Sequence, residues 1–267
     1  MNTRGMTESA PYTCGVDIGS TWTKVVLLDG EGEVAARTLA RTAMSFEQAA
    51  EAARDRALAE AGIGPEQITA TVATGYGRRN APFADRHRTE IACHARGAFH
   101  HHPHACHVVD IGGQDNKIIH LLGDGSVEHF LMNRKCAAGT GAFVEEIARR
   151  LDLDLANLER LAEGADRDIT LSSFCTVFSA TEVIKLIREG ERPENICKGI
   201  FNAVVARVAE MGQLGAKIVL TGGVAAAFPV VAAILAARTG AEVIVPPHAQ
   251  FTGALGAALE ARRPAAV

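Results

Sequence analysis

Two cysteines of this chain have the chemistry and the surroundings of metal ligands. Cys136 stands in a Lys-Cys-Ala-Ala-Gly-Thr-Gly segment and Cys175 in a Phe-Cys-Thr-Val-Phe segment. Each is followed by apolar residues at helical spacing, over 142–151 and 176–188. The unpaired amides at a helix N-terminus lower the pKa of a nearby thiol and stabilise an anionic metal-sulfur cluster. Because an iron-sulfur cluster usually takes four thiolates, one such pair per chain indicates a cluster shared by two chains.

The helix expected after Cys175 has a pattern of its own. Ser179 and Glu182 could cap it. The apolar residues expected to face inward are Val183, Ile184 and Leu186.

The residues alone leave other interpretations of these cysteines open. A free cysteine is commonly a buried small hydrophobe, which is the favoured interpretation for Cys14 and Cys197. Zinc is a rival metal, but neither Cys136 nor Cys175 has a second cysteine or histidine nearby at the spacing of zinc knuckles. A cytosolic chain of this size rarely keeps disulfides, so we expect its six cysteines to be free thiols or metal ligands.

A second set of residues with chemical potential is repeated along the chain. The tripeptide Asp-Ile-Gly occurs at 17–19 and at 110–112, each time between strand-like runs that continue through an Asp-Gly turn into a third strand. The two aspartates, Asp17 and Asp110, are 93 residues apart. In such a turn the glycine leaves backbone amides free for phosphate oxygens, and the aspartate can hold a hydrated Mg²⁺. One copy often only closes a hairpin, but two copies with matching flanks predict two lobes that face a nucleotide cleft.

These motifs must be positioned by an α/β framework. Beyond the two repeats, the pattern predicts a strand over 217–220 that runs into Thr221-Gly222-Gly223, and helices over 45–62, 193–214 and from 251 onwards. Ser45 and Gln48 are spaced as a capping box at the start of the first helix. We expect a first lobe over 1–105, a second lobe over 106–250, and a C-terminal helix over 251–267 that returns to the first lobe.

Composition and charge argue against several classes of protein. The chain has 267 residues, 48% of them apolar, which is enough to bury a core. Its net charge of -4 gives no basic surface for nucleic acid. Its N-terminus has no apolar run of the signal-peptide type, so we expect a cytoplasmic protein. The most apolar stretch, 218–237, is interrupted by Gly222-Gly223 and Pro229, which favours buried core over a membrane span.

The order of the motifs resembles a known family. The two Asp-Ile-Gly turns and the Thr221-Gly222-Gly223 turn resemble the phosphate 1, phosphate 2 and adenosine motifs of the actin, Hsp70 and sugar-kinase superfamily, whose lobes are duplicated ribonuclease H-like folds. Together with Thr-Gly-Tyr-Gly-Arg at 74–78, Cys93-His94 and both cysteine segments, they resemble the activator ATPases of 2-hydroxyacyl-CoA dehydratases. The ATPase subunits of benzoyl-CoA reductase belong to the same family. The resemblance extends from about Cys14 to Ala258, nearly the whole chain.

This resemblance implies an actin-like ATPase fold and a homodimer with one [4Fe-4S] cluster, bound by Cys136 and Cys175 of both chains. ATP binding and hydrolysis would change the angle between the helices that follow these cysteines. An electron from a donor such as ferredoxin or flavodoxin would then pass at low potential to a 2-hydroxyacyl-CoA dehydratase or a related acyl-CoA reductase. Making an electron more reducing by ~100 mV costs about 2.3 kcal/mol, a load that nucleotide-driven repacking of a dimer interface could carry.

The resemblance also assigns residues to the nucleotide. Asp17 and Asp110 would position Mg²⁺, and Gln114 would orient the attacking water, as glutamines do in other nucleotidases. Glu145, on the helix after Cys136, either reaches the nucleotide or lies on a solvated helix face. The residues expected to contact the phosphates and adenosine of ATP or ADP are Gly19, Ser20, Thr21, Thr23, Lys24, Gly112, Gly113, Gly222 and Gly223.

Two other functions stay open at this point. The chain could be a non-identical ATPase subunit of a benzoyl-CoA reductase that pairs with a paralogue. It could also be an actin-fold small-molecule kinase without a cluster, although no insertion between the motifs provides an obvious substrate pocket. The roles of Cys93 and His94 are open. The histidine-rich run over 100–107 invites a metal interpretation, but it falls in a loop that varies in the resembled family.

Overall fold

The computed structural model describes residues 11–42, 44–133, 136–171 and 176–264. Its contacts divide the chain into two compact units, Met1–Gly97 with Gly253–Val267, and Ala98–Thr252. The first unit is therefore discontinuous in sequence, and the first boundary falls within one helix, α2 (Glu90–His101). The predicted division at 105/106 and 250/251 stays a prediction.

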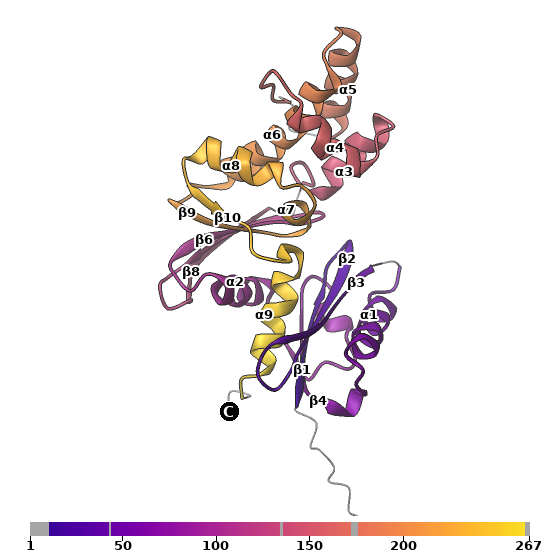
Figure 1. The fold of residues 1–267 in the computed structure, drawn as a ribbon, viewed down its shortest axis with the longest axis vertical. Coiled ribbons are helices and arrows are strands. Elements are labelled where there is room, and N and C mark those ends of the chain that lie inside the picture. Colours follow the sequence, from indigo (N-terminus) through magenta and orange to yellow (C-terminus); the bar gives the residue numbers. More distant parts are fainter. Residues whose placement is uncertain (1–10, 43, 134–135, 172–175, 265–267) are drawn as a thin grey trace, which may run out of the picture. The chain divides into compact units, whose positions relative to one another are not determined.

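The first unit is built on one mixed five-stranded sheet with the order β3-β2-β1-β4-β5 (Figure 1). β1 pairs antiparallel with β2 and β2 with β3, whereas β1–β4 and β4–β5 are parallel. The strands are β1 (Tyr12–Ile18), β2 (Trp22–Leu28), β3 (Val34–Arg41), β4 (Ile68–Thr74) and β5 (Arg86–His87).

Helices cover this sheet because their apolar or small residues face it. α1 (Phe46–Ala61) places Ala50, Ala53 and Ala57 in one core with β1 and β2. Its N-cap is confirmed as predicted, since the Ser45 side chain accepts a hydrogen bond from the amide of Gln48, and the helix ends at Gly62 in the left-handed region. The remaining helical segments of this unit are η1 (Pro65–Gln67), η2 (Arg78–Asn80), most of α2, and α9 (Thr252–Ala261).

α9 needs glycine partners to approach the sheet and α2 closely. A side chain at Gly15 of β1 would overlap the backbone of Ala254 and Ala258 in α9. A side chain at Gly256 of α9 would overlap the carbonyl group of Cys93 in α2. These positions therefore permit backbone contact on both sides of α9. The helix predicted from residue 251 onwards begins one residue later, after the 3₁₀ turn η3 (Ala249–Phe251).

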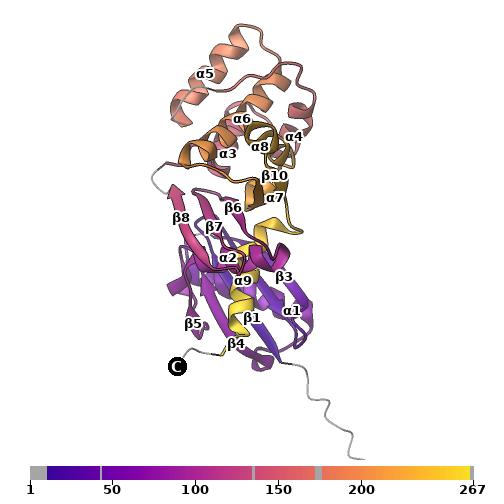
Figure 2. The ribbon, with the colours of Figure 1, turned by 90° about the vertical axis from the view of Figure 1, so that its left-hand side faces the viewer.

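The second unit repeats the sheet topology of the first. Listed from β8, its order is β8-β7-β6-β9-β10. As in the first sheet, the first two pairs in this order are antiparallel and the last two are parallel. Figure 2 shows β8 as the edge strand beside β7. Asp17 pairs with Lys24 in the β1–β2 register, and Asp110 pairs with Lys117 in the β6–β7 register. The strands are β6 (Cys106–Ile111), β7 (Asn116–Leu121), β8 (Val127–Asn133), β9 (Lys217–Thr221) and β10 (Glu242–Ile244).

The second unit also contains a group of helices between β8 and β9 in sequence. Their core holds Phe143, Ile147, Ile200 and Phe201 together with Ile118 of the sheet. α6 begins with Pro193 in its first turn and ends at Met211, three residues short of the predicted Leu214. The helices of the unit are α3 (Gly141–Arg150), α4 (Leu155–Glu163), α5 (Thr176–Arg188), α6 (Pro193–Met211), α7 (Gly223–Ala227) and α8 (Val230–Thr239).

The apolar stretch 218–237 forms part of this fold. It supplies β9, the turn at Gly222, α7 and most of α8, as the interruptions at Gly222-Gly223 and Pro229 predict. Ile218, Val219 and Leu220 are fully buried in the sheet. In the described part of the chain, no helix is both long and apolar enough to cross a membrane.

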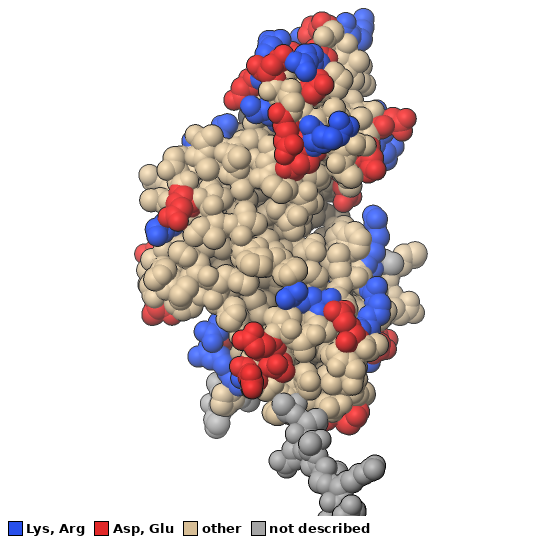
Figure 3. Space-filling view, viewed as in Figure 1, with Lys and Arg blue, Asp and Glu red and all other residues tan. Residues whose placement is uncertain are grey.

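Charged side chains of both signs are interspersed over α3 to α6 on the face shown in Figure 3. Several form ion pairs, among them Arg149 with Glu146 at 2.9 Å and Arg167 with Glu191 at 2.7 Å. Such exposed pairs each contribute little to stability. α5 differs because it exposes large apolar side chains: Phe178 is 68% exposed, Ile184 52% and Ile187 50%. The expectation from apolar spacing that Ile184 faces inward was wrong.

Candidate functional site

The loops after β1 and β6 have the same geometry. The amide of Gly19 donates to the carbonyl of Trp22 (3.1 Å), and the amide of Gly112 donates to the carbonyl of Asp115 (2.9 Å). A Cβ atom on Gly19 would lie 2.8 Å from the Trp22 oxygen, and one on Gly112 would lie 2.9 Å from the Asp115 oxygen. Both turns are therefore too tight for a side chain. The amides of the two glycines are hydrogen-bonded within the turns, whereas the sequence interpretation expected free amides there.

Each of the two predicted Mg²⁺ aspartates is paired with a lysine of the neighbouring strand. Lys24 Nζ lies 3.3 Å from Asp17 Oδ2, with side-chain exposures of 18% and 7%. Lys117 Nζ lies 3.1 Å from Asp110 Oδ2, with exposures of 4% and 3%, and 2.9 Å from Asp115 Oδ2. Lys117 was not among the predicted site residues. The repeat contains the signal for it, because Lys117 follows Lys24 at the same distance that separates the aspartates.

A threonine and a glycine complete the surroundings of each aspartate. Thr221 of β9 donates its hydroxyl to Asp110 Oδ1 (3.0 Å), and Thr74 of β4 is the register partner of Asp17. The next residues, Gly75 and Gly222, have φ of +87° and +98°. A side chain at Gly75 would overlap Asp17 Oδ1, and one at Gly222 would overlap the Ile111 carbonyl. The glycine that follows each threonine thus has no room for a side chain.

The other predicted nucleotide residues have different degrees of exposure. Ser20, Thr21 and Gly113 are partly exposed in their loops. Thr23 is fully buried, and its hydroxyl lies 2.8 Å from that of Thr42. Because neighbouring strand residues point to opposite faces, Thr23 lies on the face opposite Lys24. The exposed members of the predicted set are Gln114, Glu145 and Gly223.

The segment that follows Cys136 is hydrogen-bonded to the Gly112-Gly113 loop. The first amides of α3 donate to it, from Gly141 to the Gly112 carbonyl (2.9 Å) and from Ala142 to the Gly113 carbonyl (2.8 Å). The buried Thr140 hydroxyl lies 3.1 Å from the Gly113 carbonyl and 2.5 Å from that of Ala137. One side of the predicted phosphate loop is therefore attached directly to the N-terminal end of α3.

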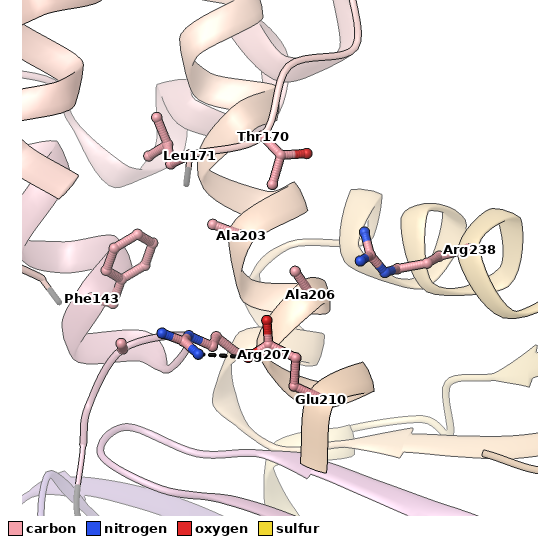
Figure 4. A pocket seen from close by; sticks show the side chains of 10 residues that line it. Phe143, Thr170, Leu171, Ala203, Ala206, Arg207, Glu210 and Arg238 are labelled. Atoms are coloured by element: carbon pink, nitrogen blue, oxygen red, sulfur yellow. Dashed lines mark hydrogen bonds and ion pairs between the residues drawn. The ribbon is translucent and has the colours of Figure 1, made fainter. Parts of the chain in front are cut away.

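Two further contacts fix the same segment on the sheet and on α6. Asn116 of β7 donates its amide to the Gly139 carbonyl (2.9 Å). Gly139 has φ of +79°, and a side chain there would lie 2.5 Å from Arg207 Cβ. Arg207 belongs to α6, donates to Glu210 (2.6 Å), and lines a pocket with Ala138 and Gly139 (Figure 4). The Cys136 segment is thus supported by both β7 and α6.

Cys136 is exposed, and its backbone and sulfur are hydrogen-bonded. The amide of Ala138 donates to Cys136 Sγ (3.4 Å), and the Asn133 side chain donates to the Cys136 carbonyl (3.2 Å). An accessible thiol that accepts an amide hydrogen bond close to a helix N-terminus suits a ligand of an iron-sulfur cluster. Its predicted partner, Cys175, lies outside the described residues. α5, which follows Cys175, is confirmed as a helix, but Ser179 and Glu182 lie within it and do not cap it.

The remaining described cysteines differ from Cys136 because they are buried. Burial raises the pKa of the Cys14 and Cys93 thiols to about 12 and that of the Cys106 and Cys197 thiols to about 11. Buried, protonated thiols of this kind are typical of structural cysteines. Cys14 and Cys197 are therefore core residues, as expected.

The structure gives Cys93 and His94 a packing position. Both are buried on α2 beside α9, where Gly256 faces the Cys93 carbonyl. A Cβ atom on Gly253 would lie 2.8 Å from His94 Nε2 and 3.1 Å from Asp17 Oδ2. His94 therefore lies near the first aspartate, although no sequence argument had given it a role.

The histidine-rich run is divided between two elements. His100 and His101 end α2, and the rings of His102 and His104 lie 5.0 Å apart after it. His107 lies on β6, where its ring stacks 3.8 Å from that of His120. His107 thus belongs to a different group of side chains from the rest of the run.

Sequence comparison finds a family and relatives over nearly the full length. The BadF/BadG/BcrA/BcrD ATPase family matches residues 14–261. The activator of lactoyl-CoA dehydratase of Anaerotignum propionicum is 45% identical over 255 residues, which cover 94% of this chain and 97% of that protein. One of the subunits of benzoyl-CoA reductase from Thauera aromatica is 34% identical over 222 residues, 80% of this chain and 78% of that protein.

Structure comparison confirms the predicted α/β, actin-like fold. The crystal structure of component A of (R)-2-hydroxyglutaryl-CoA dehydratase from Acidaminococcus fermentans has a TM-score of 0.89 at 37% identity, covering 94% of this chain and 98% of that one. The Clostridium difficile activator of 2-hydroxyisocaproyl-CoA dehydratase, with bound ADPNP, has a TM-score of 0.87 at 37% identity and 94% coverage of both chains. A glucokinase of the ROK family from Streptomyces griseus shares the fold alone, with a TM-score of 0.56 at 16% identity over 95% of this chain and 100% of that one.

Proposed function

Since this chain belongs to the BadF/BadG/BcrA/BcrD ATPase family, we propose that it is the ATP-dependent activator of a 2-hydroxyacyl-CoA dehydratase or a related acyl-CoA reductase. It would hydrolyse ATP in the cytoplasm and pass one electron at low potential to that partner, from a donor such as ferredoxin or flavodoxin. The observation that carries the proposal is the exposed Cys136 in a segment hydrogen-bonded to the Gly112-Gly113 loop.

Nucleotide chemistry would use the repeated residues. Asp17 and Asp110 would hold the water shell of Mg²⁺, while Lys24 and Lys117 would leave their carboxylate partners to neutralise phosphate charge. Gln114 would orient the attacking water, since it is exposed in the loop after β6. Lys117 is a new member of the set. Thr23 would act indirectly, because its buried hydroxyl is close to that of Thr42.

The described residues fit the cluster that the family resemblance implies. Cys136 is exposed and accepts an amide hydrogen bond, whereas the buried cysteines keep their protons. A [4Fe-4S] cluster bound by Cys136 and Cys175 of two chains would supply one-electron chemistry at low potential. Asn133 and Ala138 would hold the Cys136 backbone and sulfur in position for this task.

The surface of α5 supports the homodimer. Phe178, Ile184 and Ile187 are exposed large apolar side chains on the helix that follows Cys175. Exposed apolar side chains gathered on one helix are typical of interaction surfaces. Pairing two chains through these helices would bring the two cysteine segments together and cover this apolar surface.

The hydrogen bonds of α3 offer a physical link between nucleotide and cysteine. The amides of Gly141 and Ala142 and the hydroxyl of Thr140 hold the carbonyl groups of Gly112 and Gly113. A phosphate that moves this loop would therefore move the N-terminal end of α3, which begins five residues beyond Cys136. This coupling needs no separate relay, because the same backbone segment forms both sites.

Metal content tests the proposal most directly. Protein purified without oxygen should contain about two irons and two acid-labile sulfides per chain, as one four-iron cluster per dimer requires. Cys136→Ser should lose iron, sulfide and electron transfer while it keeps nucleotide binding. Cys106→Ala, which changes a buried cysteine, is the matched control and should keep its iron. Full iron and sulfide in Cys136→Ser would refute the assignment of this ligand.

A second candidate within the family is a subunit of a benzoyl-CoA reductase, favoured by the similarity to the Thauera aromatica protein. The dehydratase activators match more of this chain at higher identity. Native mass distinguishes the two functions, since a free activator should be a homodimer and a reductase subunit should copurify with a paralogue. Iron-free protein that phosphorylates a small molecule would instead identify an actin-fold kinase.

A further inference from the structure

The second sheet carries three histidines at positions where the first sheet has apolar residues. Cys14, Leu27 and Ala36 lie side by side on β1, β2 and β3 and belong to the core that α1 covers. The residues 93 positions later are His107, His120 and His129, on β6, β7 and β8. Because the two sheets have the same topology, each of these apolar residues of the first sheet corresponds to one histidine of the second.

The three histidine rings follow one another across the strands as a tilted stack, with interplanar angles of 45° and 31°. The ring centroids of His107 and His120 are 3.8 Å apart, and those of His120 and His129 are 3.6 Å apart. His107 Nδ1 accepts a hydrogen bond from the Gly215 amide (2.8 Å), which fixes its ring and its tautomer. His120 Nε2 is buried and has no hydrogen-bond partner within the described residues. A buried nitrogen of this kind calls for a ligand or a water.

A β-bulge adds a carboxylate to this stack. His120 pairs with His129 but the next residue, Leu121, pairs with Val127, so Glu128 is the extra residue of β8. A bulge re-aims side chains that strict alternation would send to opposite faces. Glu128 Oε2 accordingly lies 3.6 Å from His129 Nδ1. The first sheet has the same irregularity with Ala35 as its extra residue, so the bulge belongs to the repeat and the carboxylate is specific to the second unit.

The donor atoms match the needs of one metal ion. One atom from each of His120, Glu128 and His129 lies within 4.8 Å of the other two. The side chains of His129 and Glu128 are 52% and 59% exposed, so small rotations can close the remaining distance without disturbing the core.

We propose that His120, Glu128 and His129 bind a divalent transition-metal ion, with Zn²⁺ as the best match to two imidazoles and one carboxylate. Three protein ligands are enough for tetrahedral zinc with a water or an outside ligand in the fourth position. His107 would act as a positioning residue, since it stacks on His120 and is itself fixed by Gly215. The site is chemically distinct from the cysteine site, because its donors are nitrogen and oxygen rather than sulfur.

Equilibrium dialysis against Zn²⁺ followed by elemental analysis tests the site in the untagged holoprotein. We expect one zinc per chain in addition to the iron. The triple change His120→Leu, Glu128→Ala, His129→Ala installs the residues that the first sheet has at these positions, and it should remove the zinc without loss of iron. His129→Ala alone should weaken zinc affinity by roughly tenfold or more. His87→Ala, which changes an exposed histidine of the first unit, is the matched control.

The single change Glu128→Gln keeps the test valid if the triple variant does not fold, because this side chain is exposed on an edge strand. It should also weaken zinc binding. Equal zinc content and affinity in the wild type, Glu128→Gln and His129→Ala would overturn the proposal, as would the absence of bound zinc in the wild type. The iron count reports separately on the cysteine site, so failure of one site is distinguishable from failure of the other.

Discussion

The two units have separate sheets of the same topology, but they differ in the segment that connects the third and fourth strands of each sheet. In the first unit this connection carries α1 and η1, and α1 lies over an apolar sheet face. In the second unit the corresponding connection carries Cys136 and the helices α3 to α6. The repeated frame therefore supplies both units with the same Asp, Lys, Thr and Gly positions, whereas the longer connection supplies what only one unit has.

This difference shows how a duplicated scaffold can acquire a second chemistry. The Asp17–Lys24 and Asp110–Lys117 pairs come from strand register, so they persist in both copies. The loop after β6 differs from that after β1 because the N-terminus of α3 donates to its carbonyl groups. An insertion attached at the loop after β6 would gain a direct connection to a nucleotide bound at that loop, without any change to the strands.

The largest expected effect tests whether both copies of the frame serve ATP. Asp110→Asn and Asp17→Asn should each slow ATP hydrolysis by roughly 100-fold or more, the scale of removing one preorganised electrostatic contact. Iron content should not change, because neither residue lies in the cysteine segment. Phosphate release measured at saturating Mg²⁺ and ATP checks this. Asp124→Asn, in an exposed hairpin turn, is the control, and normal turnover in either test variant would remove that aspartate from the Mg²⁺ role.

The next effect compares the stability contributed by the two lysines. Lys117→Met leaves Asp110 and Asp115 without their buried partner and should cost about 3–5 kcal/mol of unfolding free energy. Lys24→Met should cost less, because the Lys24 side chain is 18% exposed and its pair is partly solvated. Denaturant unfolding of both variants makes the comparison. Lys217→Met removes an exposed pair with Glu242 and should be within about 0.5 kcal/mol of the wild type. Equal losses for Lys117 and Lys24 would contradict this account.

A smaller effect tests the connection that only the second unit has. Thr140→Val removes the hydroxyl beside the Gly113 and Ala137 carbonyls and should lower electron transfer per ATP hydrolysed by about tenfold, the equivalent of one lost buried hydrogen bond. ATP hydrolysis itself should persist. The ratio of acceptor reduced to phosphate released measures the coupling. Thr140→Ser keeps the hydroxyl and should restore the ratio, whereas a coupling defect in both variants would indicate a packing role.

The smallest effect concerns the rate at which different cysteines are alkylated, because they differ only in how accessible and how readily ionised their thiols are. In cluster-free protein at pH 8, alkylation should modify Cys136 before Cys14 or Cys93, whose thiols have a pKa of about 12. A raised pKa means that the folded protein keeps these protons where the unfolded chain loses them. These thiols therefore stabilise the fold fully below about pH 9, and this contribution is lost as pH rises towards 12.

Mass spectrometry of the labelled peptides identifies the modified residues. In the second unit, Cys106 and Cys197 have a pKa of about 11 and should begin to react at lower pH than Cys14 and Cys93 of the first. Unfolding in denaturant should remove the differences. Early modification of Cys14 would show that the first unit opens more readily than its packing indicates.

Much of the frame could be predicted from sequence because strand alternation and Asp-Gly turns are local signals. The repeat at 93 residues predicted the first three strands of each sheet, and Ser45 with Gly62 predicted the limits of α1. Lys117 was also accessible by the same offset but was missed, because Lys24 was taken as a single phosphate contact and not as part of the repeat.

Other features could not be predicted because they depend on contacts between distant segments. The stack of His107, His120 and His129 requires the register of three strands and the bulge at Glu128, which no single strand reveals. The exposure of Ile184 on α5 also escaped, since periodicity cannot distinguish a core face from an apolar surface. The end of α6 at Met211 was missed for a different reason, because the local stop signal of Gly212 directly after it was not used.

The discontinuity of the first unit has a consequence for how the chain is completed during translation. Gly15, near the start of β1, packs against Ala254 and Ala258 of α9, the last helix described. β1 therefore cannot gain this contact until residue 258 has left the ribosome. The second unit is contiguous over Ala98–Thr252 and can close earlier, although its sequence begins later. Premature termination before residue 253 would leave a folded second unit attached to a first unit with an uncovered sheet face, a direct substrate for proteolysis.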